Sequence, residues 1–310
     1  MEEAIMILEV ADLVTSKEDY KKGFLEIALI KSEHMRPYVA ETRSLEALTA
    51  EIDLPEDLLI GGKFSNSLLT AYGMSTKALN YLKLTQEDVQ LLSKEFVENY
   101  LTDLREFRTE FSIRYTIIRG DTFGGKMKNL IGTLAKRKAL HSIMASLNVL
   151  GIDFSVRIKE SKKFVPFLEY ELVDGIDAIH WHKDEFISRI LLFDKRSPIV
   201  KTNIDIILIE SDRGSIKESL CDGEKYIACG ELKGGIDPTG SDEHWKTANE
   251  ALRRVRKVKE SINTFFIGAA IENRVADEIK QQLESGILTA AANLNHDSQV
   301  ADLCNWLVSL

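Results

Sequence analysis

Several features that would indicate a secreted or membrane protein are scarce or missing in this sequence. It has only three cysteines in 310 residues, Cys221, Cys229 and Cys304. Their odd number and their spacing fit neither a disulfide framework nor a cysteine metal site, and they favour reduced thiols in a cytoplasm. No apolar run is long enough to span a bilayer. The opening segment MEEAIMILEVADLV is acidic at its start and lacks the features of a signal peptide. We therefore expect a soluble cytoplasmic protein without a membrane partner.

A net positive charge, which is common among nucleic-acid-binding proteins, is also missing. The formal net charge is -9, but residues 1–110 carry 12 basic and 21 acidic residues, whereas the remaining 200 carry 28 of each. In this balanced part, positive charge clusters in residues 111–138, which include Lys126 and Lys128, and again in residues 246–259, which begin with Lys246. Such clusters can neutralise DNA phosphates whatever the global charge. Two solvated helix faces would give the same pattern.

The spacing of apolar residues changes near residue 110 and predicts two domains. In residues 1–110 apolar residues recur at three- and four-residue steps, which is typical of amphipathic helices. After residue 110 the segment RYTIIR is a candidate strand and residues 126–149 a candidate helix. Short β-rich runs follow at 200–210, 224–233 and 263–271, with a long helix expected over 241–262 and Ser241 as its N-cap. We expect a helical domain over residues 1–110 and, over 111–310, an α/β domain with a mixed sheet flanked by helices.

Two of the expected strands carry a pair of carboxylates that could bind a metal ion. Asp205 interrupts the apolar run IDIILI, where a buried carboxylate needs a cationic partner. Glu231 and Lys233 end the run YIACGELK, and strand alternation places them on one face with Leu232 on the other. Since neighbouring strands lie about 4.8 Å apart, Asp205 and Glu231 can bind one hard cation, with the Leu232 carbonyl as a third ligand. Magnesium, which keeps waters and accepts phosphate oxygens, suits this site.

Lys233 would then stand beside the metal, where it could orient or help to deprotonate an attacking water and offset charge on a pentavalent phosphorus. The pattern Asp…Glu-x-Lys is a weak signal when taken alone. A buried ion pair of Asp205 with Lys233 would also satisfy it, without any catalysis.

Other polar residues are candidates for DNA contact. Ser75 or Thr76 predicts a helix start with Lys77 in its first turn, where a lysine can contact phosphate or merely remain solvated. Asp237, in the turn IDPTGSD, could accept a hydrogen bond from cytosine N4, or could only shape its turn before Pro238. Lys201, just upstream of Asp205, is a further candidate for base or phosphate contact.

A rival function comes from the segment Gly120–Lys126, which matches the first seven positions of a nucleotide-binding P-loop. The eighth position is Met127, where an NTPase needs a Ser or Thr hydroxyl for magnesium. We therefore favour a loop whose amides and Lys126 contact a DNA phosphate, with Lys128 and Asn129 one turn into the following helix. A DNA-binding protein without catalysis is a third alternative, disfavoured because all three active-site residue types are present.

Three segments together resemble a known family of enzymes. These are CGELKGGIDPTGSDEHWKTA, GDTFGGKMKNLIG at Gly120–Gly132, and NID at Asn203–Asp205. They closely resemble the AvaI/BsoBI family of type II restriction endonucleases, most strongly over residues 111–270. The string ELKGGIDP…DEHWKT is highly specific, whereas GDT-x-GGK-x-x-N is shared more widely among restriction enzymes. Ile204 stands where the family usually has a proline before the first aspartate.

The resemblance implies a PD-(D/E)xK nuclease core and magnesium-dependent cleavage of double-stranded DNA at 5′-CYCGRG-3′. It also implies a homodimer that surrounds the duplex with its helical domains, and a cognate DNA methyltransferase as a genetic neighbour. Asp205, Glu231 and Lys233 match the metal site of the family, and His244 matches its active-site histidine. His244 is expected in the first turn of the helix after Lys233, where a helix N-terminus disfavours the imidazolium form. A packing or capping histidine beside Trp245 is the alternative.

Overall fold

The computed structural model describes residues 8–166, 173 and 175–310, so the first seven residues of the opening segment lie outside the described part. The chain forms two compact units, one of residues 26–130 and the other of residues 131–310 together with the residues up to 25. Two long helices, α2 (Lys17–Thr49) and α6 (Phe107–Val149), contribute to both units. The domain boundary expected at residue 110 therefore falls inside α6.

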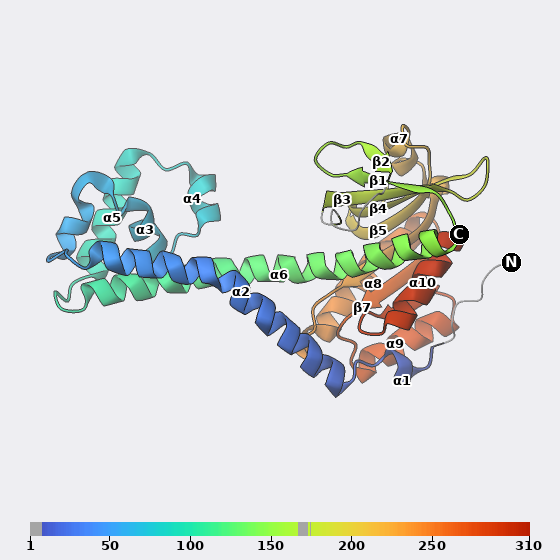
Figure 1. Ribbon diagram of the computed structural model, residues 1–310, viewed down its shortest axis with the longest axis horizontal. Coiled ribbons are helices and arrows are strands. Elements are labelled where there is room, and N and C mark those ends of the chain that lie inside the picture. The colour runs from blue at the N-terminus through green and yellow to red at the C-terminus, as the bar shows by residue number, and fades with distance from the viewer. Residues whose placement is uncertain (1–7, 167–172, 174) are drawn as a thin grey trace. The chain divides into compact units, whose positions relative to one another are not determined.

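The unit of residues 26–130, here called the helical unit, contains only helices among the elements described in it. Between the parts contributed by α2 and α6 lie η1 (Pro55–Gly62), α3 (Ser65–Ala71), α4 (Thr76–Leu82) and α5 (Gln86–Tyr100) (Figure 1). Its core is built on Leu58, Leu68, Phe96, Phe107 and Phe111. Helix α4 begins as expected, because the Ser75 hydroxyl accepts the Ala78 amide. The helical character predicted for the first third of the chain is thus confirmed.

The strand predicted at RYTIIR is wrong, because this segment lies inside α6. Phe107 and Phe111, one helical turn apart, are both fully buried in the core of the helical unit. Arg119 adds an ion pair with Glu41 of α2 at 2.6 Å. Burial on a helical period and this pairing between helices outweigh the β-propensity of two adjacent isoleucines, since propensity depends strongly on context.

The loop predicted at Gly120–Lys126 is wrong as well, because these residues continue α6 without a break. Phe123 and Met127, again one turn apart, are buried, and the Phe123 ring meets Tyr38 of α2 at 5.2 Å. In a helix interior the peptide N–H groups already bond to carbonyls four residues earlier, so they cannot cradle a phosphate. This overturns the P-loop interpretation and its NTPase alternative.

The second unit, here called the sheet unit, contains one mixed sheet of eight strands in the order β2-β1-β3-β4-β5-β6-β7-β8. Neighbours are antiparallel from β2 to β6, whereas β6, β7 and β8 are parallel. The strands are β1 (Phe154–Ile158), β2 (Phe164–Pro166), β3 (Ile176–His182), β4 (Ser188–Arg196), β5 (Asn203–Glu210), β6 (Tyr226–Lys233), β7 (Asn263–Gly268) and β8 (Ala290–Asn293). This confirms the mixed sheet and the three predicted strands β5, β6 and β7.

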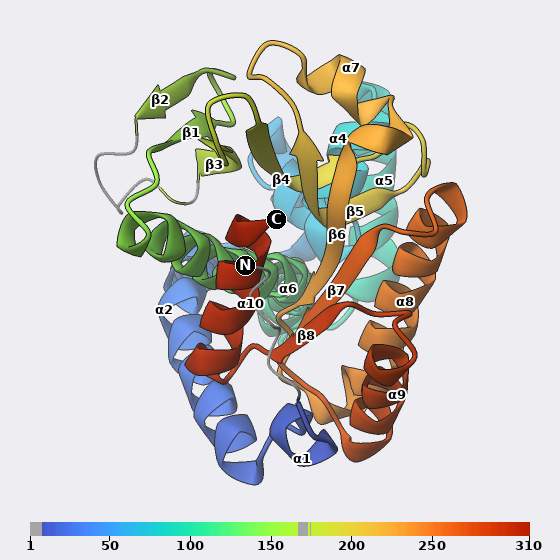
Figure 2. The same cartoon turned by 90° about the vertical axis from the view of Figure 1, so that its right-hand side faces the viewer.

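Helices cover both faces of this sheet (Figure 2). Successive residues of β7 point to opposite faces: Phe266 packs on Trp245 of α8 (Ser241–Val258), and Phe265 packs on Trp306 of α10 (Asp297–Ser309). α9 (Asn273–Glu284) and α1 (Val10–Leu13) join the core on the α8 side. The short helix α7 (Ile216–Leu220) follows β5. No helix in the described part of the chain combines the length and apolarity needed to cross a membrane.

Candidate active site

The register of two antiparallel strands brings the predicted carboxylates together at the end of β6. Ile206 of β5 pairs with Gly230 of β6, and one residue beyond this pair lie Asp205 and Glu231. Asp205 Oδ2 accepts the backbone N–H of Leu232 at 2.9 Å. A side chain of β5 therefore takes the place of a backbone acceptor at this point, which fixes the Asp205 carboxylate against β6.

Lys233 binds both carboxylates at once. Its Nζ donates to Asp205 Oδ2 at 3.0 Å and to Glu231 Oε2 at 2.8 Å. The ion pair considered as an alternative is thus present, but it includes two carboxylates rather than one. With both carboxylates ionised, these three side chains carry one net negative charge, which a bound cation would offset.

Burial makes the charges of this cluster costly. Burial, followed by repulsion from Asp205, raises the pKa of Glu231 to about 7, although Lys233 acts in the opposite direction. For Lys233, burial by itself lowers the pKa, but attraction to Glu231 and Asp205 outweighs burial and raises the pKa above its ordinary value. A charged Glu231 is thus disfavoured by its burial and by Asp205, whereas the two carboxylates favour the charged form of Lys233.

Glu231 Oε1 is the atom of this cluster that most favours a bound cation. It is buried and has no hydrogen-bond partner among the described residues. Buried polar atoms are normally satisfied, so an orphaned carboxylate oxygen beside a second carboxylate fits a metal ion. Within the described chain no group of three or more histidine, cysteine and acidic side chains gathers as a metal site. Donors at this cluster would be Asp205, Glu231 and a main-chain carbonyl such as that of Leu232.

His244 reaches the same end of the sheet from α8. It is the fourth residue of this helix, and its imidazole lies against the backbone of Gly235, two residues beyond Lys233. Ser241 does not cap α8 as predicted, because Gly240 holds the cap position and the Ser241 hydroxyl accepts the Glu272 amide instead. This bond ties the start of α8 to the start of α9.

Asp237 shapes the turn between β6 and α8. Its Oδ1 accepts the backbone N–H of Thr239 at 3.0 Å and the Thr239 hydroxyl at 2.7 Å. The hydrogen bonds from Thr239 lower the pKa of Asp237, and its side chain is exposed. The turn-shaping role is therefore present, and a contact to a base stays a prediction.

The remaining predicted DNA-contact residues are exposed but do not all belong to one unit. In the sheet unit, Lys201 lies between β4 and β5 with a positive φ of 61°, and Lys246 pairs with Asp242 one turn earlier in α8. The helical unit carries Lys77 at the start of α4, and Lys126, Lys128 and Asn129 on α6. The structure thus brings together Asp205, Glu231, Leu232 and Lys233. It places His244 against Gly235, two residues beyond Lys233.

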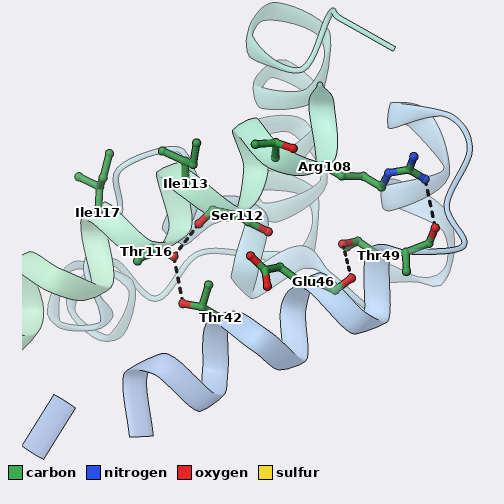
Figure 3. A pocket seen from close by; sticks show the side chains of 10 residues that line it. Thr42, Glu46, Thr49, Arg108, Ser112, Ile113, Thr116 and Ile117 are labelled. Carbon is green, nitrogen blue, oxygen red and sulfur yellow. Dashed lines mark hydrogen bonds between the residues drawn. The ribbon is translucent and has the colours of Figure 1, made fainter. Parts of the chain in front are cut away.

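A cavity elsewhere does not compete with this site. It has a volume of about 470 Å³ and lies between α2 and α6 in the helical unit (Figure 3). Thr42 and Thr116 bond to each other across it, and Arg108 already donates to the Ala50 and Ile52 carbonyls. No predicted site residue lines this cavity, whose walls combine threonine and isoleucine side chains with Glu46, Arg108 and Ser112.

Sequence reasoning missed three backbone groups of the site, namely the Leu232 amide and the glycines Gly235 and Gly240 that touch His244. The first depends on strand register, which no local pattern reveals. The doublet Gly234-Gly235 is visible in the sequence, but a pair of glycines by itself indicates only a flexible segment. The structure shows close packing at both positions instead.

Comparison with known proteins finds relatives that match nearly the whole chain. A family model described as "Restriction endonuclease BsobI" matches residues 6–310. The type II restriction enzyme BsoBI of Geobacillus stearothermophilus is 38% identical over 313 residues, covering 97% of this chain and 96% of the relative. The type II restriction enzymes AvaI of a Nostoc species and of Anabaena variabilis are each 38% identical over 307 residues, covering 96% of both chains.

Proposed function

Since the chain belongs to the restriction endonuclease BsobI family and is thus a type II site-specific deoxyribonuclease, we propose that it cuts both strands of DNA at 5′-CYCGRG-3′ with magnesium as cofactor. The observation that carries the proposal is the sharing of one lysine by Asp205 and Glu231, with Glu231 Oε1 left without a partner. The eight-stranded mixed sheet that holds them would be a PD-(D/E)xK nuclease core.

The two carboxylates and the Leu232 carbonyl would hold the magnesium ion. When bound there, magnesium supplies positive charge that polarises the scissile phosphate and lowers the pKa of water. The backbone amide of Leu232 keeps Asp205 oriented toward β6, and Lys233 keeps Glu231 oriented toward Asp205. Both carboxylates are therefore preorganised before DNA arrives, which is the condition for strong electrostatic catalysis.

Lys233 and His244 would act on the reacting atoms. The Lys233 ammonium offsets negative charge that develops on the pentavalent phosphorus, and it can orient the attacking water. His244 would accept a proton from that water on a ring nitrogen, or hold the water by a hydrogen bond. The two side chains belong to different elements: Lys233 is the last residue of β6, and His244 lies in α8.

The DNA partner and the assembly are part of the same proposal. We assign phosphate or base contacts to Lys77, Lys126, Lys128, Asn129, Lys201, Asp237 and Lys246. The helical unit would embrace the duplex, the sheet unit would cut it, and the enzyme would act as a homodimer in the cytoplasm. A cognate DNA methyltransferase would be encoded beside it.

Lys126→Ala should weaken the binding of specific and random duplexes about equally, because a phosphate contact carries no sequence information. Loss of one such contact should also make the salt dependence of binding shallower by about one unit of slope. Titrations of both duplexes at several salt concentrations measure this. Lys94→Ala, an exposed lysine paired with Glu98 on α5, is the control that should change neither quantity. A changed cleavage sequence would instead make Lys126 a base reader.

Sequencing of the cleavage products tests the proposed site. Plasmid DNA incubated with the chain and magnesium, without any nucleotide, should be cut, and run-off sequencing should place every cut within 5′-CYCGRG-3′. Cuts at another fixed sequence would correct the recognition site alone. Cutting that requires ATP would contradict the proposed reaction.

A further inference from the structure

The imidazole of His244 lies in a space that exists only because two of its neighbours are glycines. A Cβ added at Gly235 would lie 2.6 Å from His244 Cε1, which is closer than real side chains approach. A Cβ added at Gly240 would lie 3.3 Å from the same Cε1 and 3.4 Å from Nε2. Two bare stretches of backbone therefore border the same edge of the ring.

The backbone of Gly235 cannot retreat from the ring, because packing holds the residues on both sides of it. A Cβ on Gly234 would meet the Ala135 methyl of α6 at 2.5 Å and the Ile131 carbonyl oxygen at 3.0 Å. Ile236 is buried against Gly23 of α2. A Cβ added at Gly23 would lie 2.6 Å from Cγ1 of Ile236. The segment 234–236 is thus held between α6 and α2, within the sheet unit.

The helix that carries His244 is held just as firmly. Trp245 is 1% exposed, packs on Phe266, and donates its indole N–H to Glu278 at 2.8 Å. The Ser241 hydroxyl accepts the Glu272 amide at 3.1 Å. With both backbones held, the imidazole is the group at this contact that can turn, about its two side-chain torsions.

Backbone conformation does not require glycine at position 235. The glycines with positive φ in the described chain are Gly61, Gly62, Gly73, Gly151 and Gly286, and Gly235 is not among them. An alanine can therefore adopt the same backbone, and the requirement for glycine comes from the ring alone. A methyl group at this position would be relieved by rotation of the imidazole rather than by unfolding.

We propose that Gly235 is a positioning residue for DNA cleavage, whose missing side chain sets the orientation of the His244 imidazole toward the end of β6. The proposal rests on the proposed role of His244 in the reaction. Gly240 borders the same space more loosely, so an added side chain should displace the imidazole more at Gly235 than at Gly240. The backbone at the end of β6 and in the turn after it would thereby determine where the His244 imidazole lies.

Gly235→Ala should lower kcat by ~10–10²-fold and leave KM nearly unchanged, since a misplacement of about 1 Å can cost 10²-fold. Gly240→Ala should lower kcat by less than ~10-fold, because a contact of 3.3 Å needs only a small adjustment. Gly214→Ala, at a site with open space around it, is the matched control and should cut like the wild type. Thermal unfolding and metal-free DNA binding should be unchanged in all three variants.

The double variant separates this role from a general structural one. In a His244→Ala background no ring remains to collide with, so Gly235→Ala should cause no further loss under single-turnover conditions. An equal loss in both backgrounds would overturn the proposal, because the alanine would then act through Lys233 or the backbone. Full activity of Gly235→Ala would overturn it as well. If His244→Ala alone cuts at the wild-type rate, the proposed role of His244 fails and the positioning role fails with it, whereas metal-dependent cleavage itself stands.

Discussion

Glu231→Ala or Lys233→Ala lowers DNA cleavage by at least ~10³-fold while specific DNA binding survives, if the cluster at the end of β6 is the catalytic centre. Replacing Glu231 would remove a metal ligand, and replacing Lys233 would remove a positive charge that acts mainly in the transition state. Either loss should therefore appear in the rate of the chemical step and not in affinity. Single-turnover cleavage of a duplex with one site, beside binding measured without metal, separates the two.

The fold should survive both substitutions, so a loss of cleavage can be interpreted. Without Glu231, Lys233 keeps its ion pair with Asp205, and without Lys233, Asp205 keeps the Leu232 amide. Lys225→Ala is a matched control near the other end of β6, where the lysine is half-exposed and pairs with Glu210 at 2.8 Å. It should cut normally. A Lys233→Ala variant that cuts at the wild-type rate would reduce the cluster to a structural ion pair.

His244→Ala should lower cleavage by ~10²–10⁴-fold, the usual contribution of a general base, with little change in DNA affinity or thermal stability. Trp245, next in the chain, provides the buried contact that holds this part of α8, so the helix does not depend on the imidazole. His34→Ala, on an exposed position of α2, is the control for loss of a histidine. Rates measured from about pH 6 to pH 9 should stay below those of the wild type throughout.

Two outcomes would assign His244 a structural role. One is a variant that cleaves at nearly the wild-type rate over this pH range. The other is a variant that unfolds at a much lower temperature than the wild type. Lys233 would then be the remaining candidate for activating water.

The parts of the fold that the sequence predicts correctly are those with one dominant local pattern. The runs that became β5, β6 and β7 are short, apolar and bounded by turn residues. α8 has apolar residues on one helical face, of which Trp245, Ala248, Leu252 and Val255 are buried. The placement of Glu231 and Lys233 on one face of β6 follows from strand alternation alone. The cationic partner of Asp205, Lys233, follows from the cost of burying a carboxylate in an apolar run.

The failures lie where a distant contact decides the structure. The first half of α6 contains adjacent isoleucines and a group of glycines, which separately favour a strand and a loop. Burial of two pairs one helical turn apart, Phe107 with Phe111 and Phe123 with Met127, overrides both preferences, and Phe123 packs against Tyr38 of α2. Likewise, no local pattern could reveal that Gly235 meets His244, because this contact depends on how the turn after β6 folds back. Strand register belongs to the same class.

The most direct test of the central claim is cleavage of a plasmid with one 5′-CYCGRG-3′ site by the wild-type chain and by Glu231→Ala, with magnesium and with excess chelator. The account predicts a double-strand break by the wild type in magnesium, no break in chelator, and a loss of at least ~10³-fold for Glu231→Ala in magnesium. Cutting by the wild type in excess chelator would contradict the metal role of Asp205 and Glu231, as would undiminished cutting by Glu231→Ala.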